Sequence, residues 1–182
     1  MRWKILIVTL FVIFTGLSTV DKASAITAEN IDVGVTKSLQ RLEDIKGGQS
    51  VIDKADGILV FPSVFKAGIG IGGEYGEGAL VIKGKTVDYY STAAASIGFQ
   101  LGAQKKTIII AFLDKKALEN FQNSMGWKIG ADASVAVIAL GADGSIDTSK
   151  LNQPIIAFAF DQKGLMGNLT LEGAKVSKID KK

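Results

Sequence analysis

The sequence predicts an α+β domain. We expect a strongly curved, largely antiparallel sheet of about eight strands, open or closed to a barrel, with two or three covering helices. From residue 58 onward, short apolar runs alternate with brief turns, whereas few segments have helical periodicity. The 21 glycines often recur at every second strand position, where a small face lets a sheet bend sharply.

Helices are expected at residues 28–45, at residues 50–55 and after Asp114. In the first segment, apolar residues recur at steps of four, four and three, which is one face of a 3.6-residue period. Its other face carries charges of both signs, as in a helix docked on a core, whereas a membrane-surface helix is usually basic there. Asp114 has the side chain of an N-cap residue.

Strands are expected in the segments between the helices and in most of the C-terminal half. Pro62 should end the first strand, and the lysines around Gly84 should mark a hairpin turn. We expect the charged tail to fray after Val176. The expected strands are 58–61, 66–78, 78–83, 86–92, 95–104, 107–113, 127–140, 154–160 and 165–173.

Residues 1–25 have the layout of a secretory signal peptide. A basic start is followed by an apolar run of 13 residues, 5–17, and a small-residue site that ends at Ala25. We therefore expect cleavage after Ala25, a single domain at 26–182 and a periplasmic or secreted protein. The leader holds three of the 21 basic and one of the 18 acidic residues, so the mature chain is about +1. This charge does not favour a nucleic-acid partner.

Histidine and cysteine are both absent from the chain. Their absence excludes Ser-His-Asp and Cys-His nucleophiles and the usual ligand sets of zinc, copper and haem. No catalytic residue, metal or cofactor is therefore predicted. The remaining enzymatic alternative is a carboxylate-based hydrolase, which would require two of Glu74, Asp132 and Glu172 to lie close together in a cleft.

The stretch "KAGIGIGGEYGEG", residues 66–78, contains a G-x-G-x-x-G spacing formed by Gly68, Gly70 and Gly73. A dinucleotide-binding turn requires a helix after these glycines, but "EYGEGALVIK" has the pattern of a strand. We therefore interpret Gly68, Gly70, Gly72 and Gly73 as structural glycines on a strand with one bare face, which lets a neighbour approach closely.

Two lysine pairs are the candidate anion-binding residues. If the sheet bends near residues 93–95, the turns that carry Lys83 and Lys85 and those that carry Lys105 and Lys106 meet at one end. Four cations there could contact an acidic lipid headgroup. Without the bend the pairs lie at opposite ends. Four aromatic residues are expected either in the core or at its rim, or along a lipid groove: Tyr75, Tyr89, Tyr90 and Trp127.

Four sequence blocks, in order, resemble the SYLF domain. They are "GILVFPSVFKAGIGIGGEYGEGAL", "YYSTAAASIGFQLGAQ", "GWKIGADASV" and "GLMGNLTLEGAKVSKI", within a likeness that runs from Ile31 to Ile179. This family occurs in bacterial exported proteins and in eukaryotic lipid- and actin-associated proteins. The resemblance implies a binding domain that is not an enzyme. Eukaryotic relatives bind phosphoinositides and a fungal branch binds actin, but no family site residue is carried over.

The resemblance and the expected signal peptide together predict an exported lipid-binding module. Its expected partner is a membrane surface with acidic headgroups or another envelope amphiphile. The alternative is a module that binds an envelope protein.

Overall fold

The computed structural model describes residues 26–98, 104–139, 143, 145–146, 148–161, 164 and 171–181. The expected signal peptide and parts of the expected strands at 95–104 and 165–173 lie outside them. The helices are α1 (Ala28–Glu43), α2 (Gly48–Lys54) and α3 (Lys115–Gln122), with a 3-10 helix at Thr148–Asn152. The strands are β1 (Gly57–Ile82), β2 (Lys85–Gly98), β3 (Gln104–Phe112), β4 (Trp127–Lys128), β5 (Ala136–Val137), β6 (Ile155–Phe160) and β7 (Lys175–Ile179).

All the strands belong to one sheet with the order β4-β7-β2-β1-β3-β6-β5. Every pair is antiparallel except β5 with β6. The two outermost strands are joined by residues 129–135 alone. Even seven flat strands would place them roughly 29 Å apart, and the doubled β1 described below makes the flat distance larger. An extended connection would reach roughly 28 Å, and this one is shortened where the Gly130 N–H donates to the Ala133 carbonyl. The sheet therefore curls into a half-barrel, which confirms the predicted fold class.

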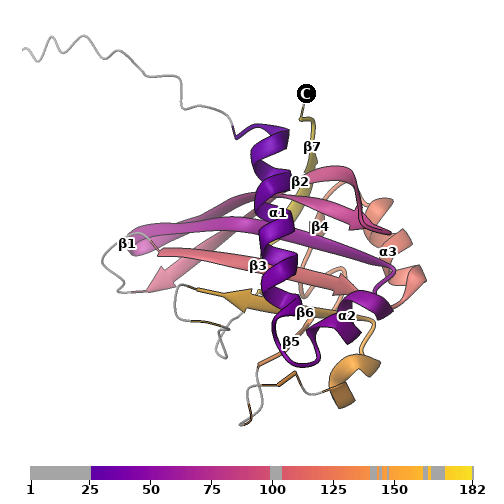
Figure 1. Cartoon of the computed structure of the whole chain (residues 1–182). Coiled ribbons are helices and arrows are strands. Elements are labelled where there is room, and N and C mark those ends of the chain that lie inside the picture. The colour runs from indigo at the N-terminus through magenta and orange to yellow at the C-terminus, as the bar shows by residue number, and fades with distance from the viewer. Residues whose placement is uncertain are drawn as a thin grey trace, which may run out of the picture.

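β1 doubles back on itself, as Figure 1 shows. Its first half pairs with β3, from Gly57 opposite Phe112 to Lys66 opposite Gln104, and its second half pairs with β2. The halves approach so closely that a Cβ atom at Gly78 would collide with the carbonyl oxygen of Val60. Counting the halves separately gives eight strand segments in the described residues, as predicted.

Both faces of the sheet are covered. On one face, α1 and α2 pack on a core that includes Val60, Ile109 and Phe158. On the other, α3 packs on a second core with an aromatic cluster of Tyr90, Phe112, Phe121 and Trp127. The alternating residues of β1 and β3 divide between these cores, which is the period-two pattern expected of buried strands.

The predicted helices are confirmed. Thr27 caps α1 by accepting a hydrogen bond from the Asn30 N–H at 3.2 Å. Asp114 caps α3, as predicted, by accepting from the Ala117 N–H at 2.8 Å. The β1–β2 turn is also confirmed, because Lys83 and Gly84 have the positive φ angles of a tight hairpin turn, 51° and 73°.

Several strand boundaries were predicted wrongly. β1 continues through Pro62, where a register shift between Phe61 and Val64 accommodates a residue without an N–H. The strand expected at 127–140 is reduced to β4 and β5, because the chain turns at Gly130 (φ 88°) and the Asp132 carboxylate accepts from the Lys128 N–H at 2.6 Å. β2 also runs unbroken through 93–95, where a bend was considered.

The prediction of a frayed tail is wrong as well. Residues beyond Val176 form most of β7, which pairs with β2 from Tyr89 to Ala93. Lys181 then bonds back to the start of the described chain, with its ammonium 2.6 Å from Glu77 and 2.9 Å from the Ile26 carbonyl. Figure 1 accordingly shows the C-terminus near the start of α1.

Candidate functional site

The candidate site is the end of the sheet at which β1 doubles back. We define the β1 tip by six residues from β1 and β3: Phe65, Lys66, Glu74, Tyr75, Lys105 and Lys106. The antiparallel register brings the two strands together there, with Phe65 opposite Lys105 and Lys66 opposite Gln104.

A carboxylate lies between two lysines of the β1 tip. Glu74 is 2.6 Å from the Lys106 ammonium and 3.7 Å from that of Lys66. The side chains of Glu74 and Lys106 are only 16% and 11% exposed, so this pair is shielded from water. Three lysines and one glutamate leave the tip with two uncompensated positive charges.

Two aromatic rings of the β1 tip are exposed. Phe65 is 49% and Tyr75 51% accessible to solvent, in a strand whose other large apolar residues are mostly buried. The Lys105 ammonium lies over the Phe65 ring, 5.8 Å from its centre, at the distance of a cation–π contact. The Tyr75 hydroxyl donates to Glu77 at 2.9 Å. Partial burial, and then this bond to an anion, raises the pKa of Tyr75.

The structure does not gather the four predicted lysines into one cluster. Lys83 and Lys85 flank the β1–β2 turn, beside Gly57, where a Cβ atom would lie 3.4 Å from Ile82. Lys106 pairs with Val64. The seven residue-to-residue steps of extended strand from Gly57 to Val64 separate the pairs by roughly 23 Å. Of the four, only Lys105 and Lys106 lie at the β1 tip.

Glu74 lies apart from the other two predicted carboxylates. Lys66 and Lys106 hold Glu74, and β2 and β7 separate its strand β1 from β4, the strand next to Asp132. Two intervening strands correspond to roughly 14 Å. Asp132 accepts from the Lys128 N–H, and Glu172 lines a pocket together with Ile129 and Gly130. Neither of these two carboxylates therefore pairs with Glu74 in a hydrolytic site.

The glycine stretch is a strand, as predicted, because β1 runs through all of it. No helix follows Gly73, so the context of a dinucleotide-binding turn is missing. The backbones of Gly68, Gly70, Gly72 and Gly73 belong to the strand. The close approaches described by the structure occur later in the stretch, at Gly76 and Gly78.

Sequence reasoning missed Phe65 and Lys66 as site residues. Phe65 directly precedes the glycine stretch and Lys66 is its first residue, so a basic residue follows an aromatic one there. This pattern could have been noticed in the sequence. The register that sets Phe65 opposite Lys105 could not have been predicted, because it depends on the shift at Pro62.

Residues 93–182, about half of the chain, match the model of a protein family described as "Ysc84: Las17-binding protein actin regulator". No curated protein matches the chain. The matched segment includes Lys105 and Lys106, whereas Phe65, Lys66, Glu74 and Tyr75 precede it. In the described part of the chain, no helix combines the length and the apolar character needed to cross a bilayer.

Proposed function

The chain belongs, through residues 93–182, to the Ysc84 (SYLF) family, described as a Las17-binding protein actin regulator. On this premise, together with the resemblance to lipid-binding SYLF domains, we propose that it is an exported, non-catalytic lipid-binding module. The β1 tip contacts a membrane surface with acidic headgroups. Binding is peripheral and involves no chemical step.

The observation that carries this proposal is the pairing of exposed rings with uncompensated lysines at the β1 tip. Aromatic rings suit the boundary between water and acyl chains. Lysines near an anionic surface each contribute about 1 kcal/mol. At the β1 tip, Phe65 and Lys105 offer both interactions within one cation–π contact.

Export rests on the signal-like segment 1–25, which predicts a mature chain that begins at Ile26. Expression of the full chain in a bacterial host, followed by fractionation and N-terminal sequencing, tests this part. We expect the exported fraction to begin at Ile26. Recovery of the chain in the cytoplasm with residues 1–25 still attached would contradict export, but it would not test the lipid contact.

Vesicle co-sedimentation tests the lipid contact. We expect residues 26–182 to sediment with vesicles containing an anionic phospholipid, and less at raised salt, because salt screens exposed charges. Lys105→Glu removes both uncompensated charges of the tip. This change should weaken binding by about 2 kcal/mol, roughly 30-fold.

The matched control is Lys83→Glu, which makes the same charge change at an exposed position near the opposite end of the sheet. It should leave anionic-vesicle binding close to that of the unsubstituted protein. If both substitutions weakened vesicle binding equally, binding would depend on net charge, and this result would contradict a site at the β1 tip. Absence of vesicle binding by the unsubstituted protein would overturn the lipid proposal itself.

A protein partner is the second candidate, favoured by the family description, which names a protein-binding actin regulator. Exposed aromatic residues beside a cation are also typical anchors of protein interfaces. Cross-linking from a cysteine placed at Phe65, in intact envelopes, separates the two candidates. Recovery of one protein adduct together with no vesicle binding would favour the protein partner.

A further inference from the structure

A small pocket lies on the side of the molecule opposite the helix pair α1 and α2, where the curled sheet nearly meets itself. Its volume is about 200 Å³. We name it the seam pocket, because its lining comes from the chain that runs from the end of β4 through β5, the two outermost strands, and from the residues before β7. The lining residues are Ile129, Gly130, Ser134, Val135, Val137, Leu171 and Glu172.

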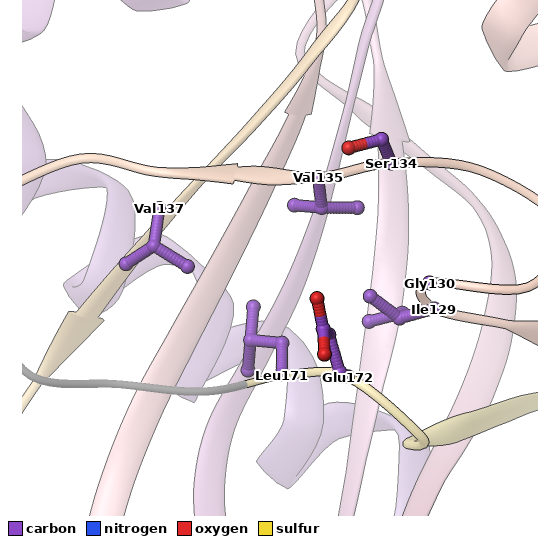
Figure 2. Close-up of a pocket in the computed structure, with 7 residues that line it drawn as sticks. All are labelled: Ile129, Gly130, Ser134, Val135, Val137, Leu171 and Glu172. Carbon is purple, nitrogen blue, oxygen red and sulfur yellow. The ribbon is translucent and has the colours of Figure 1, made fainter.

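Four of the seven lining residues of the seam pocket have apolar side chains. Ile129 and Leu171 are buried members of the α3-side core, and Val135 and the β5 residue Val137 pack against that core. Figure 2 shows these four side chains directed toward a common space. The walls can therefore receive methyl or methylene groups, and they are held by the core of the domain.

One carboxylate, that of the exposed residue Glu172, belongs to the lining. In Figure 2 the side chain of Glu172 points between the walls, toward the segment that carries Ser134 and Val135. Within the described residues no lysine or arginine pairs with Glu172, although six other ion pairs form there. Gly130 lies beside Glu172, since a Cβ atom at Gly130 would lie 3.3 Å from the Glu172 Cγ.

We infer that the seam pocket binds an alkylammonium group. The unpaired carboxylate favours a cation, and the four apolar side chains of the lining favour the carbon atoms attached to it. The volume is below the range of drug-sized sites, so it suits a short chain or a methylated ammonium of a few heavy atoms. An anion would meet the Glu172 charge and be excluded.

Such a group occurs both on free small amines and on zwitterionic lipid headgroups. The inference does not depend on the β1 tip, because Glu172 and the tip lysines belong to different elements and have opposite charges. Loss of anionic-lipid binding would leave the seam pocket untouched.

Titration of residues 26–182 with n-butylammonium, followed by amide chemical shifts, tests the site. We expect shifts concentrated at Gly130, Ser134 and Glu172, with much weaker effects from n-butanol and none from butyrate. Glu172→Gln should weaken butylammonium binding by about tenfold, which corresponds to the loss of one charge-assisted contact. Since Glu172 is exposed and unpaired in the described structure, this substitution should leave the remaining spectrum unchanged.

The control variant is Glu43→Gln, an equally conservative change at an exposed position of α1. It should leave the affinity unaltered. Equal binding of butanol and butylammonium, or unchanged binding by Glu172→Gln, would overturn the cation site. Choline and phosphatidylcholine vesicles then separate the sources. Competition by choline alone indicates a free amine, and competition by the vesicles as well indicates a headgroup.

Discussion

At the scale of single residues, Glu74 controls the charge of the β1 tip. It neutralises one of three lysines and shares its oxygens between Lys66 and Lys106. A shielded pair of this kind is costly to break, because one partner would remain charged and poorly hydrated. Glu74 therefore supports the fold and, at the same time, competes with any external anion for the two lysines.

Glu74→Gln should separate these two roles. The charge of the tip rises by one, so anionic-vesicle binding should strengthen about fivefold, from about 1 kcal/mol per lysine. The free energy of unfolding should fall by about 1–3 kcal/mol, because Lys106 loses its partner. Urea unfolding and vesicle co-sedimentation measure the two effects.

Glu119→Gln provides the control for that experiment. It raises the net charge equally but lies on α3, in an exposed pair with Lys115. Stronger vesicle binding by both variants would mean that total charge, and not the β1 tip, governs binding.

At the scale of elements, β1 shows how much the sequence could predict. The period-two glycines were enough to identify a strand and to reject a helix after Gly73. They could not show that the strand doubles back, because that depends on contacts between residues far apart, such as Gly78 with Val60. Pro62 led to a wrong strand end. The register shift around Pro62 means that no N–H is required from it, and such a bulge leaves no signature in the local sequence.

Gly78→Ala tests the folded-back strand. The added Cβ atom would collide with backbone, which cannot move aside as a side chain can. We expect a loss of about 3 kcal/mol or more in the free energy of unfolding. Gly73→Ala is the matched control in the same strand, since its nearest contact would be an ordinary 3.8 Å. Similar urea midpoints for the two variants would refute the close approach of the two halves.

At the scale of the whole molecule, the fold class was predictable, but the order of the strands at the edge of the curled sheet was not. Strand-like runs and a capped helix at Asp114 sufficed for a curved α+β domain. The position of β7 between β4 and β2 was missed, because its charged residues resemble a tail when Trp127 and Thr92, the partners of Val176, are unknown. The candidate site was half predicted. Lys105 and Lys106 were identified, but their ring and carboxylate neighbours follow from the register.

Alkaline unfolding tests the integrity of the whole core. Burial, and then the negative charge of Asp88, raises the pKa of Tyr90 to about 12. Because the folded pKa lies above the unfolded value near 10, the neutral tyrosine stabilises the fold fully below pH 10. This stabilisation is lost as the pH rises toward 12.

The measurement is thermal unfolding at a series of pH values, together with the absorbance of ionised tyrosine. Tyr90→Phe should flatten the decline in stability between pH 10 and 12. If stability declined as steeply in that variant, the decline would come from other groups, such as Tyr75 and Tyr89, whose pKa values are also raised.

The bond from Lys181 to the Ile26 carbonyl has a consequence for engineering. Because residues 26 and 181 meet on β1, a short glycine linker can join them and make the backbone a closed ring. New ends can then be opened at the turn of Lys83 and Gly84, where nothing lies within 4 Å of a Cβ at Gly84. Such a circular permutant would carry its free ends at the opposite end of the sheet from the β1 tip, and a surface could be coated with the tip facing outward.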